Sequence, residues 1–207
     1  MLGKFMEFKE KSPQEILENR VKQHQRKTFG TTTLRAERYV GASLSQMKWS
    51  KSEMAKVDSF MKSKKNFLVV LGSPGTSKTY FCSALSDWIL DNFQTHRYWM
   101  EGALFDRIKR GFESHEGSPK VLEYLIDDDI VILDDVGSNS WTEWKEDVFF
   151  DLINIRYNSM LPTVITSNLT RKQFYEIYQP RVTSRLFASE NTVIELQDAQ
   201  DFREIGK

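Results

Sequence analysis

Short apolar segments alternate with longer segments of helical periodicity along most of the chain. Five segments have strand length, and we expect strands at about 67–71, 97–100, 130–133, 163–166 and 192–196. Between them, apolar residues recur three or four positions apart, which predicts helices at about 52–64, 79–92, 101–111, 119–126, 143–159, 171–178 and 181–187. Because strands and helices alternate, we expect a parallel sheet with helices on both faces.

The first part of the chain has a different pattern. A serine N-cap followed by proline predicts a helix from Ser12 to about Lys27. Its apolar positions are few, namely Ile16, Leu17 and Val21. Such a thin apolar face cannot form a core of its own, so the helix is expected to dock onto another surface. We therefore divide the chain into a helical arm at 1–34 and a compact domain at 35–207.

Charge is distributed unevenly, although the formal net charge of the chain is zero. Residues 1–66 carry 15 Lys and Arg against 7 Asp and Glu, so 15 − 7 gives +8. Residues 67–207 carry 14 against 22, so 14 − 22 gives −8. The basic front part favours an anionic partner, either nucleic acid or an acidic protein surface. Lysines that only solubilise a helical arm would give the same pattern.

The few cysteines and histidines exclude several classes of site. Cys82 is the single cysteine, so the chain can form neither an internal disulfide nor a cysteine zinc site. His24, His96 and His115 lack the spacing of metal ligands. Neither a secretory signal nor an apolar run of membrane-spanning length is present. We therefore expect a cytoplasmic protein without a membrane partner.

A glycine-rich turn follows the first predicted strand and ends in Lys78-Thr79. Small residues let successive backbone N–H groups point at a polyphosphate, Lys78 can reach the outer phosphates, and the Thr79 hydroxyl suits Mg²⁺. The helix that follows directs its positive end at the anion. The expected nucleotide contacts here are Gly72, Ser73, Pro74, Gly75, Thr76, Ser77, Lys78, Thr79 and Tyr80. The alternative is a glycine-rich turn in an unrelated α/β protein.

Ser77 departs from this phosphate-binding pattern, because the residue before the lysine is normally glycine. Glycine suits a tightly packed loop that needs an unusual dihedral angle. We expect nucleotide binding to survive at Ser77, with affinity or turnover altered.

Paired acids end the third predicted strand. Asp134 is expected to hold Mg²⁺, directly or through water, and Asp135 to orient or deprotonate an attacking water. The alternative is a strand end with two solvated acids. Asn168 ends the fourth strand, where a neutral amide can orient the same water. The order of these elements predicts a P-loop nucleotide-binding fold.

Two arginines near the end of the domain lie four positions apart and so share one helical face, namely Arg181 and Arg185. Nothing close in sequence neutralises them. An arginine at a subunit edge can reach the γ-phosphate of a neighbouring subunit and stabilise transition-state charge. The alternative is a pair of surface arginines paired with Glu176 or Glu190.

Together these segments resemble the AAA+ helicase loaders of bacteria and their phages, with the transposition helper ATPases as the closest sister group. The segments that carry the resemblance are 37–44, 72–79, 134–137, 142–144, 154–157, 161–169, 184–186 and 201–203. The resemblance implies a P-loop AAA+ (ASCE) fold: a three-layer αβα domain with a five-stranded parallel sheet and no C-terminal lid. A site without a lid must be closed by a neighbouring subunit, which implies a homo-oligomer.

The resemblance also implies roles for residues. ATP and Mg²⁺ would be the cofactors, held by Lys78, Thr79, Asp134 and Asp135, with Asn168 as sensor 1. Arg185 would be the arginine finger, with Arg181 as the less favoured choice. The resemblance places Arg38 near the adenine, Arg203 near the nucleotide, and Arg156 in an intersubunit or γ-phosphate contact. Members of the family bind single-stranded DNA and grip the replicative hexameric helicase with an N-terminal segment, here 12–27.

Three functions are consistent with the sequence. The first is an ATP-dependent loader of the replicative DNA helicase that acts in the initiation of DNA replication. The second is a transposition helper ATPase. The third is a nucleotide-gated DNA-binding adaptor with little hydrolysis, which Ser77 motivates. Candidate phosphate contacts for any of these are Lys109 and Arg110, beside Phe112, and the stretch from Lys51 to Lys65. Solvated helix faces would give the same pattern.

Overall fold

A computed structural model of the chain describes residues 39, 41–63, 66–91, 96–113, 125 and 129–196. The expected arm at 1–34, Arg38 and Arg203 lie outside these ranges. The expected helix at 119–126 also lies outside them, apart from one residue, Leu125.

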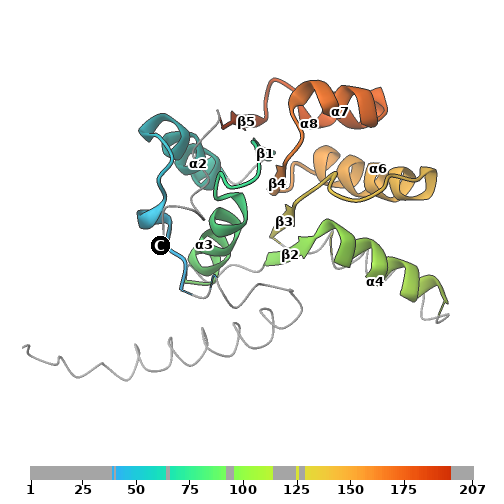
Figure 1. The fold of residues 1–207 in the computed structure, drawn as a ribbon, viewed down its shortest axis with the longest axis horizontal. Helices are drawn as coiled ribbons and strands as arrows, with labels where there is room; N and C mark the ends of the chain where they lie inside the picture. The colour runs from blue at the N-terminus through green and yellow to red at the C-terminus, as the bar shows by residue number, and fades with distance from the viewer. Residues whose placement is uncertain are drawn as a thin grey trace, which may run out of the picture.

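Five parallel strands form a single sheet with the order β2-β3-β4-β1-β5 (Figure 1). The strands are β1 (Phe67–Leu71), β2 (His96–Met100), β3 (Ile130–Asp134), β4 (Thr163–Ser167) and β5 (Thr192–Glu195). This confirms the predicted five-stranded parallel sheet. The order places the glycine-rich turn at 72–79, which follows β1, beside the carboxyl end of β4.

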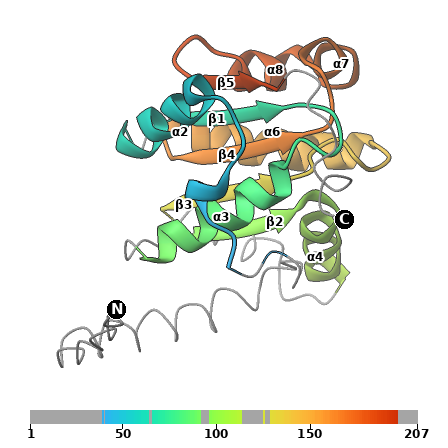
Figure 2. The ribbon, with the colours of Figure 1, turned by 60° about the vertical axis from the view of Figure 1, so that its left-hand side comes forward.

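Helices cover both faces of the sheet, as Figures 1 and 2 show. One face carries α2 (Lys51–Ser63) and α3 (Lys78–Asp91), and a short 3₁₀ turn, η2 (Leu44–Gln46), lies beside α3. The other face carries α4 (Glu101–Glu113), α6 (Glu143–Asn158), α7 (Arg171–Ile177) and α8 (Pro180–Leu186). In the described ranges, no helix combines the length and apolar content needed to cross a bilayer.

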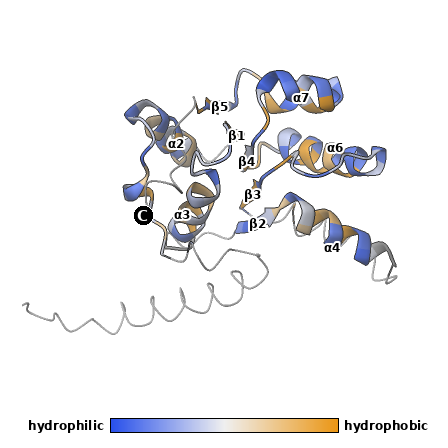
Figure 3. Cartoon of the chain, in the orientation of Figure 1, coloured by the Kyte–Doolittle hydropathy of each residue, from blue (hydrophilic) through white to orange (hydrophobic). Residues whose placement is uncertain are grey.

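Alternate residues of each central strand serve the two layers. In β1, Leu68 and Val70 pack with α2 and α3, whereas Phe67, Val69 and Leu71 pack with the helices of the other face. All five are buried, which is why the strand reads as one apolar run rather than an alternating one. Figure 3 shows that the helices carry both hydrophobic and hydrophilic positions.

The amino edge of the sheet contains a buried arginine, Arg156 of α6. Its side chain is fully buried, and Nε donates to Thr163 Oγ1 at 2.7 Å. The terminal nitrogens donate to the carbonyl oxygens of Leu125 at 2.6 Å and Pro162 at 2.7 Å. The expectation that Arg156 contacts a neighbour or a γ-phosphate is therefore wrong. Its guanidinium links segments at the end of the sheet where β4 begins, not where it ends.

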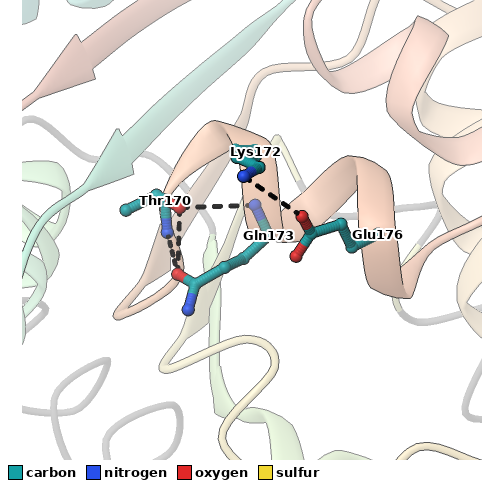
Figure 4. Close-up of polar contacts among 4 residues, drawn as sticks. All are labelled: Thr170, Lys172, Gln173 and Glu176. Atoms are coloured by element: carbon teal, nitrogen blue, oxygen red, sulfur yellow. Dashed lines mark hydrogen bonds and ion pairs between the residues drawn. The ribbon is translucent and has the colours of Figure 1, made fainter.

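A capping box starts α7 immediately after β4 (Figure 4). The Thr170 hydroxyl accepts from the Gln173 amide N–H at 3.3 Å, and the Gln173 side chain accepts from the Thr170 N–H at 2.8 Å. Lys172 and Glu176 form an exposed pair on the same helix, with 3.8 Å between Nζ and Oε1. The cap thus marks the start of α7 two residues after Asn168.

Candidate functional site

A cavity of about 370 Å³ lies at the carboxyl edge of the sheet. Its lining residues are Tyr39, Pro74, Gly75, Ser77, Lys78, Thr79, Tyr80, Met100, Asp134, Asp135 and Asn168. The structure thus brings together the phosphate-binding turn, the paired acids and the fourth-strand asparagine. Gly72, Ser73 and Thr76 do not line this cavity but shape its wall through bonds to Lys78.

Lys78 lies at the centre of the turn. Its Nζ donates to the carbonyl oxygens of Gly72 at 2.6 Å and Ser73 at 2.8 Å, and to Thr76 Oγ1 at 3.1 Å. The Thr76 hydroxyl donates in turn to the Ser73 carbonyl at 2.9 Å. The loop therefore closes around the ammonium group, which is buried and contributes positive charge to the cavity wall. Because α3 begins at Lys78, its positive end also faces the cavity.

Ser77 adopts a left-handed backbone conformation, with φ of +65°. Glycine reaches this region without steric penalty, whereas a residue with a Cβ pays roughly 1–2 kcal/mol. This dihedral angle explains why glycine is usual before the lysine, and it locates the strain that serine introduces. Gly75, two residues earlier, has φ of +90° and needs the same freedom.

Asp134 is held by both neighbouring strands. Its carboxylate is almost fully buried and accepts from the Tyr98 hydroxyl of β2 at 2.6 Å and from the Thr166 hydroxyl of β4 at 2.5 Å. Thr79, its predicted partner in binding Mg²⁺, lines the same cavity. Hydroxyl and carboxylate oxygens are the ligands that Mg²⁺ prefers, so the donor set fits that ion.

Sequence analysis missed Tyr98 and Thr166. Thr166 stands in the polar tip of the fourth strand, which is a signal in the sequence, although Asn168 at the same tip is the more usual residue for orienting water. Tyr98 gave a weaker signal, because an aromatic residue in an edge strand is usually read as part of the core. Only the order β2-β3-β4 places both hydroxyls beside Asp134.

The second acid, Asp135, is bonded to the predicted sensor. Asn168 Nδ2 donates to Asp135 Oδ1 at 2.6 Å, and the Asp135 amide N–H donates to Thr166 Oγ1 at 3.1 Å. Asp135 also has a left-handed backbone, with φ of +61°. The carboxylate that sequence analysis names as the base and the amide that it names as the sensor therefore form one unit on the cavity wall.

A buried thiol lies behind the acids. Cys82 of α3 is fully buried beside Asp134 and Thr166. Burial raises the pKa of the Cys82 thiol well above its ordinary value, and the negative charge of Asp134 raises it further. The thiol is therefore protonated at neutral pH and adds no second negative charge beside Asp134.

Tyr39 and Tyr80 form the wall of the cavity next to the turn. Their rings meet edge-on with centroids 6.1 Å apart. The Tyr80 hydroxyl donates to Gln46 Oε1 at 2.8 Å and accepts from the Ser43 amide N–H at 3.1 Å. The segment that was expected to lie near an adenine thus borders the cavity, although Arg38 itself lies outside the described residues.

The two arginines of α8 lie on α6 of the same subunit and do not line the cavity. The Arg181 and Arg185 guanidinium carbons lie 4.3 and 5.0 Å from the ring centroid of Phe150. Arg181 pairs with Asp147 at 2.6 Å, and Arg185 Nε donates to Asn154 Oδ1 at 3.0 Å. Both side chains remain partly exposed.

The partners named in the alternative interpretation are engaged elsewhere. Glu176 pairs with Lys172, and Glu190 accepts from the Tyr157 hydroxyl. The acid that neutralises Arg181 lies 34 residues away in sequence, which is why local inspection did not find it.

Comparison with known proteins agrees with this geometry. The model of the family described as IstB-like ATP binding protein matches residues 19–187, which is most of the chain. Solved structures of similar fold include DnaI, with 22% identity, a TM-score of 0.66 and coverage of 81% of this chain and 94% of that one. The DnaC helicase loader has 20% identity, a TM-score of 0.68 and coverage of 78% and 100%.

A replication initiator, DnaA, solved with AMPPCP and single-stranded DNA, is also similar: 17% identity, a TM-score of 0.69 and coverage of 82% of this chain and 53% of that one. At these identities the likeness establishes the fold alone, a three-layer α/β domain with a five-stranded parallel sheet. Among curated proteins, YdaV of Escherichia coli K12, described as uncharacterized, is 23% identical over 115 residues. That match covers 56% of this chain and 46% of YdaV, less than half of the relative's length.

Because the family model matches most of this chain, the chain belongs to the IstB-like ATP-binding protein family.

Proposed function

We propose that this protein is an ATP-dependent loader of the replicative DNA helicase in the initiation of DNA replication. One observation carries the proposal: a single cavity joins the phosphate-binding turn, the acids at the end of β3 and Asn168. The similarity in fold to DnaI and to a DnaC helicase loader supports the more specific assignment. The protein would act in the cytoplasm as a homo-oligomer on single-stranded DNA.

In this proposal ATP lies along the turn, with Lys78 on its outer phosphates. Thr79 and Asp134 would hold Mg²⁺, and the Tyr98 and Thr166 hydroxyls orient the Asp134 carboxylate. The bound ion supplies charge neutralisation on the phosphate oxygens. Asp135 takes the proton of the attacking water, and Asn168 keeps that carboxylate in place.

The neighbouring subunit completes the site with an arginine. Neither Arg181 nor Arg185 lines the cavity of its own subunit. Arg185 is the better candidate because its side chain donates hydrogen bonds to a neutral amide and a backbone carbonyl, whereas Arg181 is paired with Asp147. Moving Arg185 onto a neighbour's γ-phosphate breaks no ion pair, so it costs less than moving Arg181.

The test measures ATP binding and ATP hydrolysis separately. Asp135→Asn should bind ATP and hydrolyse almost none. Arg185→Ala should bind ATP normally and lose stimulated hydrolysis, since an arginine finger contributes roughly 10³–10⁵ in rate in related chemistry. Arg181→Ala is the matched control and should retain most of the activity.

Mixing the two inactive variants tests whether the site is shared. An oligomer that combines Asp135→Asn and Arg185→Ala subunits contains some sites with an intact cavity and an intact neighbouring arginine, so activity should return. Normal hydrolysis by Arg185→Ala alone, or no recovery on mixing, would exclude the shared site. Absence of ATP binding by the wild-type protein would exclude the whole proposal.

The partner is tested by affinity capture with the full chain and with a variant that lacks residues 1–34. A hexameric helicase captured by the full chain but not by the shortened one supports the loader. Capture of a transposase instead would support the transposition helper. ATP binding without hydrolysis, with or without single-stranded DNA, would support the nucleotide-gated adaptor that Ser77 suggests.

A further inference from the structure

A tryptophan from outside the phosphate-binding turn is hydrogen-bonded to its backbone. Trp49 lies between η2 and α2, and its indole Nε1 donates to the Thr76 carbonyl at 2.9 Å in a buried contact. The indole ring packs on Phe81 of α3, with centroids 4.6 Å apart. Trp49 therefore reaches across 27 residues of sequence to the loop that borders the cavity.

The bonded carbonyl belongs to the peptide group that precedes Ser77. Because a peptide group is planar, fixing the Thr76 oxygen also fixes the direction of the Ser77 N–H. On the other side, the Ser77 carbonyl accepts from the Phe81 amide N–H at 2.9 Å in the first turn of α3. Both peptide groups that flank Ser77 are held, one by Trp49 and the other by the helix.

These two anchors determine the φ angle of Ser77, which is the strained one. If Ser77 relaxed to a negative φ while α3 stayed in place, the Thr76 carbonyl would rotate away from the indole. The buried indole N–H would then lose its partner, which is costly. The hydrogen bond thus opposes the relaxation that the serine Cβ favours, and the two effects are similar in size.

We propose that Trp49 is a positioning residue that holds Ser77 in the left-handed conformation, so that serine can occupy a position that normally requires glycine. The proposal rests on the proposed function in one respect, which is that the turn binds a nucleotide. The proposal has one specific consequence. The backbone conformation of the turn depends on the indole N–H when residue 77 is serine, and hardly depends on it when residue 77 is glycine.

The competing explanation is that Trp49 only fills space against Phe81. A double-mutant cycle separates the two, with the affinity for a fluorescent ADP analogue in the presence of Mg²⁺ as the readout. Trp49→Phe keeps an aromatic ring and removes the N–H, and it should weaken binding by about tenfold. Ser77→Gly alone supplies the reference affinity of the cycle, because glycine adopts the same φ without penalty.

The double variant Trp49→Phe/Ser77→Gly should bind within about threefold of Ser77→Gly, because the strained residue is gone. Trp141→Phe is the matched control, because the Trp141 indole N–H is buried and has no hydrogen-bond partner in the described residues. It should leave affinity unchanged and show no coupling to Ser77→Gly. A double variant as weak as Trp49→Phe, or a Trp49→Phe variant of normal affinity, would overturn the proposal.

The same cycle is repeated with urea unfolding in the absence of nucleotide, so that it does not depend on nucleotide binding. Ser77→Gly should recover most of the stability that Trp49→Phe loses. If Trp49→Phe does not fold, the proposal requires the added Ser77→Gly change to restore folding, and failure to do so contradicts it. A wild-type protein that binds no nucleotide would contradict the proposed function, while the unfolding cycle would still decide the role of Trp49.

Discussion

A buried charged group lies at each end of the parallel strands, at the amino edge and at the carboxyl edge of the sheet. The two groups have different roles. At the amino edge, the Arg156 guanidinium is fully buried and donates to three protein oxygens. At the carboxyl edge, Asp134 is equally buried and accepts from two hydroxyls, yet it also lines a cavity. Burial alone therefore does not identify a functional charge. The difference lies in whether the group faces only protein atoms or also an open site.

The largest expected effect is at the amino edge. Arg156→Met should lower the free energy of unfolding by about 3–5 kcal/mol, because three buried acceptors lose their donor together. Urea unfolding measures this, with Arg185→Met as the matched control on the same face of the sheet. The control should change stability by less than about 1 kcal/mol, since Arg185 is partly exposed. Equal effects of the two variants would remove the contrast between the edges.

The next largest effect is expected at Gly137, which lies close to Leu169 near the carboxyl edge of the sheet. Gly137 has φ of +83°, and a Cβ placed there would lie 2.4 Å from Leu169 Cδ1. Gly137→Ala should therefore destabilise by about 2–3 kcal/mol, from backbone strain plus the clash.

Gly41→Ala isolates the backbone part of that cost. Gly41 has a similar φ of +81°, but a Cβ there would meet nothing within 4 Å. Its thermal unfolding should show a loss of only about 1 kcal/mol. If the two alanine variants lost the same stability, the contact with Leu169 would contribute nothing.

A third prediction concerns the hydroxyl that orients Asp134. Tyr98→Phe should lower the apparent affinity for Mg²⁺ in nucleotide binding by about tenfold. This is the low end of the loss expected when a group that orients a metal ligand is removed. Nucleotide affinity in excess EDTA should stay unchanged. Titration of Mg²⁺ against a bound fluorescent nucleotide measures both quantities.

Tyr178→Phe is the control for that change. The Tyr178 hydroxyl is also buried but has no hydrogen-bond partner in the described part of the chain. Its removal should leave the apparent affinity for Mg²⁺ at the wild-type value. A Tyr98→Phe protein with wild-type Mg²⁺ dependence would show that Thr166 alone positions the carboxylate.

The smallest effect concerns Glu101, a buried acid that accepts hydrogen bonds from a neighbouring loop. Glu101 accepts from the Gly137 amide N–H at 3.0 Å and from Asn139 Nδ2 at 3.2 Å. Burial raises its pKa above the ordinary glutamate value, and these hydrogen bonds only partly oppose the shift. Between the unfolded and folded pKa values the folded state binds more protons. Its stability therefore falls as pH rises through that window.

Glu101→Gln should remove this component. The stability of the variant relative to the wild type should rise as pH increases from about 4.3, the usual glutamate pKa, through the raised value, and then level off. Urea unfolding at a series of pH values measures the difference. A difference that falls across the same window would show that Glu101 is stabilised as an anion.

The sequence allowed the elements that line the cavity to be predicted because each is local. The turn at 72–79 and the acids 134–135 each follow an apolar strand, and parallel strands end at the same edge. Tyr98 and Thr166 could not be assigned in this way, since their contacts with Asp134 depend on which strands are neighbours. Arg156 was assigned wrongly because a motif position gives no information on burial.

The strand order has a consequence for how the domain assembles. β1 lies inside the sheet and pairs only with β4 and β5, which are made near the end of the described chain. β1 therefore stays without these lateral partners until β4 and β5 have been made. Contacts of such high sequence separation form slowly, so the turn at 72–79 that follows β1 gains its support among the last events of folding.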